Sequence, residues 1–426
     1  MDTKILVFPC GSEIGLEIHR SLQWCKNIAL YGVSSVKSNH GRCVYKNYIE
    51  GIPFVDDPEF LSKLNEIIEE YEIDFVYPAH DSVVLRLAEN QDSLICDVIA
   101  SPVQTCRICR SKLLTYKAFD SKLKVPKRYS MGDKEYEFPI FLKPEVGQGS
   151  RGVQIVDCLT DLKFYLSKDP AMLILEFLPG KEFTIDCLTD RHGELRFVGA
   201  RERVRIQNGI SVDTHPAEGE EFRKFADIIN DTIRFRGGWF FQVKEAADGQ
   251  LALLEIAPRI AGSMGLYRNL GVNIPLLSVF DRLGMDFDIL CNSHSIKMDR
   301  ALYSRFEHNL TYQHVYIDLD DTIINKGKMN LMVVAFLYQC LNKGIKTHLL
   351  SRHQGNINSV LRKHRLEAIF DTITQLSPLQ EKADYIKKAQ SIFIDDSFSE
   401  RSKVARKLVI PTFDVDAIEN LLDWKV

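Results

Sequence analysis

The sequence predicts a multidomain protein that combines the α/β and α+β classes. Short apolar runs alternate with amphipathic helical segments near both ends of the chain, which is typical of parallel sheets built from βαβ units. From about residue 109, strands with alternating charges predict an antiparallel region between the two parallel ones. The 426 residues are enough for about three units at roughly 150 residues each.

Composition narrows the function to small-molecule chemistry in a folded protein. Hydrophobic residues make up 45% and charged residues 26%, which excludes disordered, fibrous and disulfide-scaffold proteins. The net charge of −4 provides no broad basic field, so we expect no nucleic-acid partner. The longest apolar stretch, 331–341, is shorter than the ~20 residues that span a bilayer, so we expect no membrane segment.

The cysteines and the start of the chain predict a cytoplasmic location with reduced thiols. The ten cysteines are scattered, and the apolar run after Lys4 is too short for a secretion signal. Cys106 and Cys109 form one C-x-x-C, but a closed zinc site needs a second ligand pair, which is not evident. We expect these two to be free thiols.

The first hundred residues predict a parallel αβ domain, which we place at 1–108. Residues 4–8, 28–33 and 74–78 are expected strands, and 60–71 is an expected amphipathic helix. The first turn, 11–15, lacks the G-x-G-x-x-G spacing of a dinucleotide site. Close packing of strand against helix explains its glycines.

The middle region, 109–300, predicts an expected helix at 112–120 followed by mostly antiparallel strands. The expected strands share alternating charge, and they lie at 138–143, 153–156, 173–177 and 194–205. A polar stretch without period, around 292–313, contains the predicted linker, 301–311. The apolar run 315–317 then begins a third unit, 312–426.

A phosphate cradle is one interpretation of the segment after residue 140. Lys143 ends an expected strand beside a loop that contains Gly147, Gly149 and Gly152. Glycines let backbone N–H groups approach phosphate oxygens, and the lysine adds a point charge. Glycine-rich turns are also ordinary hairpins, so this stretch alone leaves both readings open.

Four separated motifs carry a family resemblance. In order and spacing, 141–153, 176–186, 240–243 and 255–259 are similar to the ATP-grasp superfamily. Residues 1 to about 300 resemble its carbamoyl-phosphate-synthase-like branch, including the N-terminal pre-ATP-grasp αβ domain. The resemblance implies an ATP-grasp fold and a ligase that activates a carboxylate with ATP and joins it to an amine or related nucleophile.

The resemblance also implies a set of ATP contacts. Lys112 and Lys143 would contact phosphates, and the loop with Gly147, Gly149, Ser150 and Gly152 would cover them. Glu176, with the backbone of Phe177 and Leu178, would face adenine. Glu182 would hold the ribose hydroxyls.

Metal and transfer residues follow from the same motifs. Gln242 and Glu255 match ligands of Mg²⁺, with Mn²⁺ as a second possibility, and Arg259 matches the arginine that steadies the transferred phosphoryl group. The family usually has Glu-x-Asn-Pro-Arg, whereas Ala257 occupies the asparagine position here. An alanine cannot coordinate metal, so water completes the shell or the second magnesium site is weak.

Arginines at 201, 203 and 205 are spaced to share one face of a strand. A solvated, charged edge is one reading. The resemblance favours a second, in which they, with Arg201 foremost, face phosphate or an acidic substrate. His215, in the following loop, is either a substrate contact or an exposed histidine.

The third unit begins with an apolar strand that ends in Asp318-Leu319-Asp320-Asp321-Thr322. This D-x-D-x-T is similar to the first motif of the haloacid dehalogenase superfamily, in which one carboxylate attacks phosphorus and the next moves a proton to the leaving oxygen. The alternative reading is a solvated strand end or helix start.

Three further matches follow in the family's order. Ser351 ends an expected strand and would bind the phosphoryl group, and Lys382, at the head of an expected amphipathic helix, would neutralise it, with Lys387 as the alternative. Asp395 and Asp396 would complete a Mg²⁺ site with Asp318 and the backbone oxygen of Asp320. The motif distances leave no room for either usual cap, so we expect a Rossmann-like, capless, open phosphatase.

The sequence therefore predicts a bifunctional enzyme. An ADP-forming ligase would act on small-molecule carboxylate and amine substrates, and a phosphatase would hydrolyse a phosphorylated metabolite. If a ligase substrate carries phosphate, that metabolite would be the ligation product. Three alternatives compete: the ATP-grasp half is a nucleotide-sensing module for the phosphatase, the phosphatase half transfers phosphate to an acceptor, or the protein is purely structural. The last would leave both sets of motifs unexplained. Sequence identifies neither substrate nor the oligomeric state.

Overall fold

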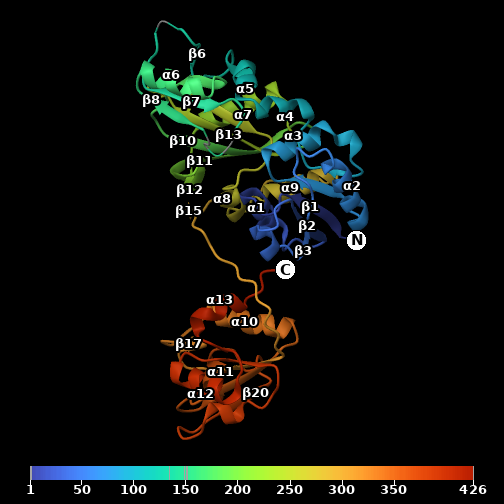
Figure 1. Cartoon of the computed structure of the whole chain (residues 1–426), viewed down its shortest axis with the longest axis vertical. Helices are drawn as coiled ribbons and strands as arrows, with labels where there is room; N and C mark the ends of the chain where they lie inside the picture. The colour runs from blue at the N-terminus through green and yellow to red at the C-terminus, as the bar shows by residue number, and fades with distance from the viewer. Residues whose placement is uncertain (1, 134, 148, 150–151, 426) are drawn as a thin grey trace. The chain divides into compact units, whose positions relative to one another are not determined.

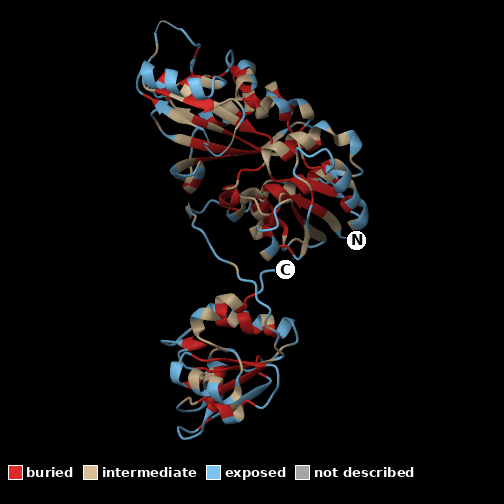
Figure 2. Cartoon of the chain, viewed as in Figure 1, coloured by how far each residue is buried: buried red, intermediate tan, exposed pale blue. Residues whose placement is uncertain are grey.

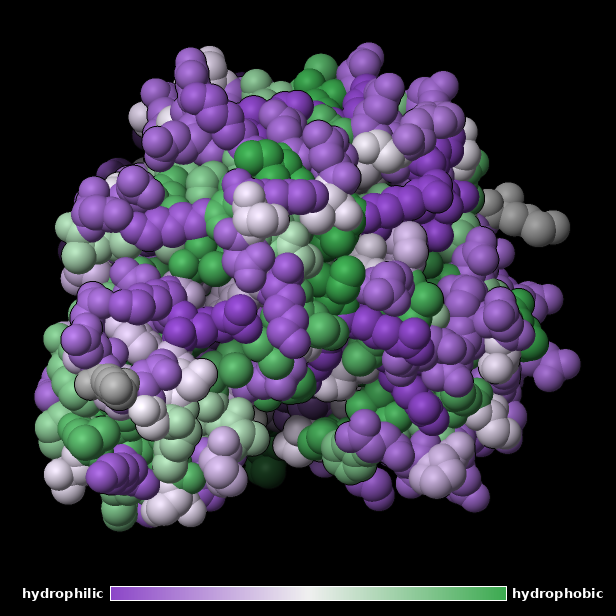
Figure 3. Space-filling view, turned by 90° about the horizontal axis from the view of Figure 1, so that it is seen from above, coloured by the Kyte–Doolittle hydropathy of each residue, from purple (hydrophilic) through white to green (hydrophobic). Residues whose placement is uncertain are grey.

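The computed structural model describes residues 2–133, 135–147, 149 and 152–425, and it divides into two compact units, 2–302 and 303–425. Figure 1 shows the elements of each unit. No helix among the described residues is long and apolar enough to cross a membrane. The face in Figure 3 is largely hydrophilic, with hydrophobic side chains in small patches.

The first unit begins with a five-stranded parallel sheet of order β3-β2-β1-β4-β5. Its strands are β1 (Thr3–Phe8), β2 (Ile28–Ser34), β3 (Asn47–Glu50), β4 (Phe75–Pro78) and β5 (Asp97–Val98). Its helices are α1 (Glu13–Leu22), α2 (Phe60–Tyr71), α3 (Asp81–Glu89) and α4 (Val103–Arg110), with the 3₁₀ turns η1 (His40–Cys43) and η2 (Gln91–Ser93). The βαβ pattern predicted for this region is confirmed.

Two mainly antiparallel sheets follow, as the alternating charges predicted. The four-stranded sheet, β6-β9-β7-β8, contains β6 (Arg128–Tyr129), β7 (Ile140–Pro144), β8 (Gln154–Val156) and β9 (Met172–Glu176). The six-stranded sheet, β14-β13-β10-β11-β12-β15, contains β10 (Glu182–Thr189), β11 (Leu195–Gln207), β12 (Ile210–Pro216), β13 (Gly237–Glu245), β14 (Leu251–Ala257) and β15 (Met298–Asp299). Their helices are α5 (Lys112–Phe119), α6 (Leu159–Lys168), α7 (Glu220–Thr232), α8 (Gly265–Asn269) and α9 (Ile274–Arg282).

Shared cores hold these parts of the first unit together. One apolar cluster joins β1 and α1 to the segment with α8 and α9, so residues after the third sheet pack back on the first. Another fills the space between α7 and the six-stranded sheet. Figure 2 shows buried residues concentrated along the strands.

The stretch predicted to be irregular contains one strand. β15 pairs with β12 through Asp213↔Asp299 and Thr214↔Met298. Arg205 also forms an ion pair with Asp299, at 3.0 Å. These long-range contacts extend the sheet at a place where the local sequence has no strand period.

The second unit is built on a parallel sheet of order β20-β19-β16-β21-β22. Its elements are β16 (His314–Ile317), β17 (Ile324–Asn325), β18 (Lys328–Met329), α10 (Leu331–Asn342), β19 (Lys346–Ser351), α11 (Ile357–Lys363), β20 (Thr372–Gln375), η3 (Lys382–Tyr385), β21 (Ser391–Ile394), α12 (Phe398–Leu408), β22 (Thr412–Phe413), η4 (Val415–Ala417) and α13 (Ile418–Leu421). Apolar clusters cover both faces of the sheet.

Two local features of this unit bear on the predictions. Only the small hairpin β17–β18 separates β16 from α10, and α11 and β20 fill the segment between β19 and η3. The amphipathic helix predicted at Lys382 is wrong: the segment 382–385 is one 3₁₀ turn. Lys382 itself turns inward and is buried, while Ala383 and Ile386 pack in the core.

Candidate functional sites

A cavity of about 190 Å³ in the first unit is lined by residues of both antiparallel sheets. Its lining includes most of the predicted ATP contacts: Lys112, Lys143, Gly147, Gly149, Glu176, Phe177, Leu178, Glu182, Gln242 and Glu255. Because these residues come from segments far apart in the sequence, the fold gathers them at one place. Of the remaining predicted contacts, Ser150 lies outside the described residues, and Gly152 and Arg201 are not in this lining.

Lys143 is anchored by an irregularity in the sheet. Gln242 pairs with Glu255 and Val243 with Leu253, so Leu254 is the extra residue of a β-bulge. Its carbonyl accepts hydrogen bonds from Lys143 Nζ at 3.3 Å and from the Tyr116 hydroxyl at 2.9 Å. The bulge therefore supplies a backbone acceptor that holds the lysine in the cavity.

Burial tunes the two lysines of the cavity. It lowers the pKa of Lys143 to about 8, against the opposing charges of Glu255 and Glu182. It also lowers the pKa of Lys112, against Glu255. Lys112 Nζ lies 3.4 Å from the carbonyl oxygens of Glu145 and Gly147, at the start of the glycine loop. Both ammonium groups are desolvated, which favours an anionic ligand beside them.

The two carboxylates predicted to face the nucleoside both line this cavity. Glu176, at the end of β9, accepts a hydrogen bond from the Lys127 backbone N–H at 3.0 Å. Glu182, at the start of β10, forms ion pairs with Arg203 and, at 3.9 Å, with Lys244. Arg203 Nη2 also donates to the Gly209 carbonyl at 2.7 Å.

The turn between β11 and β12 touches the glycine loop. Gly209 has φ +75°, and a Cβ placed there would lie 2.4 Å from the carbonyl carbon of Gly149. Only glycine allows this backbone conformation and this approach together. The turn thereby fixes the position of Gly149 at the cavity wall.

A second cavity adjoins the first. Both are lined by Lys112, Gly147, Gly149, Arg203, Gly209, Gln242 and Glu255. The lining of the second adds the cations Arg110, Arg201 and Arg259 and the anions Glu13 and Asp81. Gln242 and Glu255, which face each other across β13 and β14, line both cavities and offer oxygen donors of the kind that Mg²⁺ prefers.

Arg201 is buried at the wall of the second cavity. Its Nε donates to Asp186 at 2.8 Å, and both side chains are 1% exposed. Arg201 Nη1 has no hydrogen-bond partner among the described residues. A buried N–H without a partner is costly, so this atom favours an acceptor brought by a ligand.

Arg259 is held in place by Asp81, which comes shortly after β4 of the parallel sheet. Its Nε and Nη2 each lie 2.7 Å from the carboxylate of Asp81, at the start of α3. Burial would raise the pKa of Asp81, but the charge and hydrogen bonds of Arg259 hold it below its ordinary value. The bidentate pair fixes the guanidinium at the edge of the second cavity.

The environment of Ala257 is apolar on one side. Ala257 pairs with Phe240 across the strands and forms a small buried cluster with Phe240 and Ala261. It also lines the second cavity, and it follows Glu255 by two residues on β14. The position that carries asparagine in the resembled family therefore offers no metal donor here.

The structure separates the remaining candidates from the cavities. A register shift lies between Arg203 and Arg205, and Arg205 pairs with Asp299 instead, so the prediction that all three arginines share one face is wrong. His215 Nδ1 lies 3.0 Å from the carbonyl of Pro216. Neither Arg205 nor His215 lines a cavity described above.

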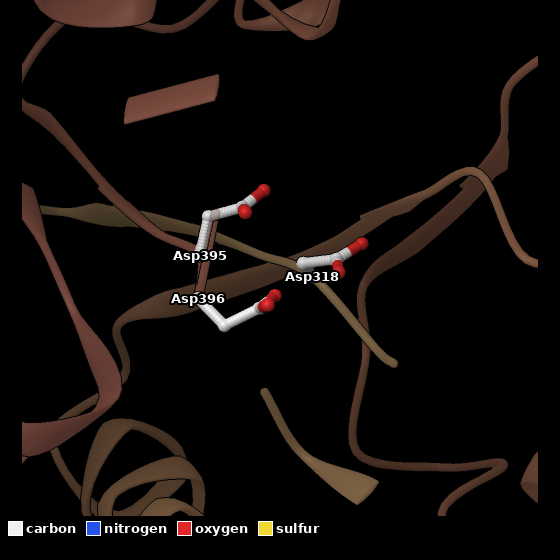
Figure 4. Close-up of side chains that lie close together, drawn as sticks. All are labelled: Asp318, Asp395 and Asp396. Atoms are coloured by element: carbon white, nitrogen blue, oxygen red, sulfur yellow. The ribbon is translucent and has the colours of Figure 1, made fainter. Parts of the chain in front are cut away.

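In the second unit, three carboxylates converge at the carboxyl edge of the sheet. Asp318 follows β16, and Asp395 and Asp396 follow the neighbouring strand β21 (Figure 4). One oxygen from each lies within 4.8 Å of the others. The donor set is the hard-oxygen type that suits Mg²⁺.

Lys382 lies among these acids. Its Nζ is 2.8 Å from Asp318 and 2.6 Å from Asp395, and the lysine is 4% exposed. Burial raises the pKa of Asp318 against the charge of Lys382. Burial likewise raises the pKa of Asp395 to about 6. The positive charge of Lys382 opposes this shift, and the negative charge of Asp318 adds to it. Lys387, the alternative lysine, is exposed.

The remaining predicted residues border the same cluster. Ser351, at the end of β19, is 1% exposed, and its hydroxyl has no hydrogen-bond partner among the described residues. Asp320 is half exposed and contacts His353. Thr322 binds Asp396 twice: its hydroxyl donates to Oδ1 at 3.2 Å and accepts from the backbone N–H at 3.0 Å.

Sequence reasoning missed the partners that hold these groups. Asp81 and His353 each pair with a predicted residue from another part of the chain, and Asp186 pairs with Arg201 on the next strand. Asp81 could have been found, because a polar residue just after a parallel strand lies at the edge where sites form. Nothing local marks Asp186, which lies inside a strand.

With this geometry in place, comparisons identify the class of the first unit. A family model described as "ATP-grasp in the biosynthetic pathway with Ter operon" matches residues 168–299. The unit is similar in fold to the biotin carboxylase domain of 2-oxoglutarate carboxylase from Hydrogenobacter thermophilus, solved with MgADP and bicarbonate. The TM-score is 0.56, with 15% identity, over 67% of this chain and 71% of that chain. The first unit has the ATP-grasp fold, and part of it, residues 168–299, matches an ATP-grasp family model.

Two curated relatives match this chain over only part of their length. The carbamoyl phosphate synthase large chain of Clostridium beijerinckii is 23% identical over 256 residues, 54% of this chain and 23% of that protein. The D-alanine–D-alanine ligase of Petrotoga mobilis is 26% identical over 168 residues, 38% of this chain and 54% of that protein. This chain thus spans about a quarter of the first relative and about half of the second.

Proposed function

We propose that the chain carries two active sites: an ADP-forming ATP-grasp ligase and a Mg²⁺-dependent phosphomonoester hydrolase. The ligase would comprise a pre-ATP-grasp domain at 1–108 and an ATP-grasp domain at 109–300. A linker at 301–311 would lead to a haloacid dehalogenase-like phosphatase at 312–426. The ligase proposal rests on the match to an ATP-grasp family model, on the ATP-grasp fold and on two adjoining cavities. The phosphatase proposal rests on the side chains of the second unit alone.

The pair of cavities that share Gln242 and Glu255 carries the ligase proposal. ATP would occupy the first, with its phosphates beside Lys112 and Lys143. An acidic substrate would occupy the second, where Arg201 Nη1 offers a buried donor without a partner. A carboxylate oxygen would attack the γ-phosphorus, ADP would leave, and an amine would then displace phosphate from the acyl phosphate. Arg259, fixed by Asp81, would stabilise the charge of the phosphoryl group in transit.

The residues for a magnesium ion in this half fit in part. Gln242 and Glu255 supply two oxygen donors at the junction of the cavities, and Ala257 supplies none. Mg²⁺, or Mn²⁺, would neutralise the nucleotide phosphates when bound there. The apolar cluster around Ala257 supports one metal with a water-completed shell.

The convergence of Asp318, Asp395, Asp396 and Lys382 carries the phosphatase proposal. Asp318 would attack phosphorus, while Lys382 and the Ser351 hydroxyl would bind the phosphoryl oxygens. Asp320 would deliver a proton to the leaving oxygen. The three carboxylates fit a magnesium ion, which would neutralise the phosphate that Asp318 approaches.

Substrate sharing would link the two sites. If the acid or the amine carries a phosphate, the phosphatase would remove it from the ligated product. The test incubates Asp318→Asn protein and wild type with ATP, Mg²⁺ and a metabolite extract, followed by mass spectrometry. A phosphorylated conjugate that accumulates only with Asp318→Asn is expected; identical metabolite profiles would contradict the sequential scheme.

A second candidate function follows from Ala257. With one donor missing, the ATP-grasp half would bind nucleotide and regulate the phosphatase without ligation. In that case wild type releases no ADP with any pool of acids and amines, yet ATP changes the rate of phosphate-ester hydrolysis. ADP release that depends on an added acid would exclude this candidate.

A further inference from the structure

Asp320 has a partner that its sequence neighbourhood does not indicate. His353 Nδ1 lies 2.9 and 3.0 Å from the two carboxylate oxygens of Asp320. The His353 side chain is 16% exposed, whereas that of Asp320 is 50% exposed. An exposed carboxylate is ordinarily free to rotate, so this contact selects one orientation of its plane.

His353 is itself held in place. Gln375 ends β20 directly beside Ser351, its register partner on β19. The Gln375 amide donates to the carbonyl oxygens of His353 and Gly355, each at 2.8 Å. Gly355, with φ +109°, turns the chain back toward α11. The loop 352–356 is therefore clamped at the carboxyl edge of the sheet, on the side where Asp318 lies.

We propose that His353 is a positioning residue for Asp320 in the hydrolysis of phosphate esters, and the inference rests on the proposed phosphatase function. The Asp318 carboxylate forms a bond to phosphorus as the ester P–O bond breaks. The proton of the Asp320 carboxyl passes to the ester oxygen, which leaves as an alcohol. Asp320 then takes a proton from the water that attacks the aspartyl phosphate, so inorganic phosphate leaves and both carboxyls are restored. His353 keeps its own protons and orients Asp320 in both steps.

This role predicts a dependence on the leaving group. A simple alkyl oxide is a strong base and needs the proton from Asp320, whereas 2,4-dinitrophenolate leaves without one. A misdirected Asp320 therefore slows alkyl phosphates far more than the dinitrophenyl ester. Damage to the fold, or loss of phosphate binding, slows both substrates alike.

The experiment uses the full chain with Mg²⁺ and compares kcat/KM for an alkyl phosphate and for 2,4-dinitrophenyl phosphate. His353→Ala should lose about tenfold or more on the alkyl ester and less than about threefold on the dinitrophenyl ester. His353→Asn, whose amide N–H stands near the place of Nδ1, should recover most of the alkyl activity. Gln375→Ala should give the same pattern in weaker form, and His364→Ala, at the end of α11, should leave both rates unchanged.

The outcomes are distinguishable. Equal losses on both esters in His353→Ala, or no difference between the Ala and Asn variants, would overturn the positioning role while leaving the phosphatase intact. Wild type that hydrolyses neither ester faster than Asp318→Asn would overturn the proposed phosphatase itself, and the positioning role with it. Additive effects of His353→Ala and Asp320→Asn on the alkyl ester would show that the two residues act independently.

Discussion

Lys382 Nζ lies 2.8 Å from the carboxylate of Asp318, and both side chains are buried, at 4% and 9% exposed. The same ammonium group is 2.6 Å from Asp395, so one cation balances two buried anions. Removal of a single partner from such a cluster leaves charge that has neither solvent nor a counter-ion.

Lys382→Met should therefore abolish hydrolysis of phosphate esters and destabilise the second unit by about 3–5 kcal/mol without Mg²⁺. Urea unfolding in EDTA, followed by circular dichroism, measures the second effect. Lys387→Met is the matched control, because Lys387 is exposed, and it should change neither quantity. A variant of Lys387 that loses activity while the Lys382 variant keeps it would reverse the assignment of the two lysines.

The pKa of Lys143, lowered by burial to about 8, makes stability and ATP binding depend on pH. Between about pH 8 and 10.5 the unfolded chain binds more protons at this lysine than the folded chain, so the stability of wild type rises with pH there. Below pH 8 both states carry the proton, and the buried charge costs up to about 3 kcal/mol. Lys143→Met should thus stabilise the first unit at pH 7 while abolishing ATP binding.

ATP affinity should follow the same lysine in the opposite direction. As the free protein loses this proton above pH 8, the dissociation constant measured by titration calorimetry should rise. Lys143→Arg keeps its charge, so its affinity should be flatter between pH 7 and 9.5. A wild-type affinity independent of pH would show that Lys143 does not contact the phosphates.

The contact between Gly209 and Gly149 can be tested with a matched glycine. Gly209→Ala places a Cβ against the backbone of Gly149, whereas Gly249→Ala, with a similar φ of +78°, meets nothing within 4 Å. Each should cost about 1 kcal/mol of backbone strain in unfolding experiments, and Gly209→Ala should cost more, because its Cβ also overlaps the backbone of Gly149. Only Gly209→Ala should also weaken ATP binding, by about tenfold; equal affinities for both variants would contradict the role of this turn.

Ala257→Asn should restore an oxygen donor at the junction of the two cavities. The polar amide would disrupt the apolar cluster that Ala257 forms with Phe240 and Ala261, which should cost about 1–3 kcal/mol of stability. If a second metal position exists beside Glu255, the Mg²⁺ concentration that half-saturates ADP formation should fall. An unchanged metal dependence with intact folding would show that this position lies outside the metal shell.

Strand ends were the part of the sites that sequence could indicate. Asp318, Ser351 and Asp395 each follow a short apolar run, and parallel strands bring such ends to one edge of a sheet. Periodicity gave no basis for choosing between Lys382 and Lys387, because the choice depends on a single inward turn of chain. Sequence could not indicate the partner of Arg201 either, because the register of β10 against β11 brings Asp186 to it.

The extra residue at Leu254 sets stability and function against each other. Deletion of Leu254 would give β13 and β14 an uninterrupted ladder and keep Gln242 opposite Glu255, so a search for stabilising deletions would favour it. The shortened strand would also lack the free carbonyl that Lys143 and Tyr116 share. Length variation at this point should therefore be rare among chains that use ATP and common among those that have lost it.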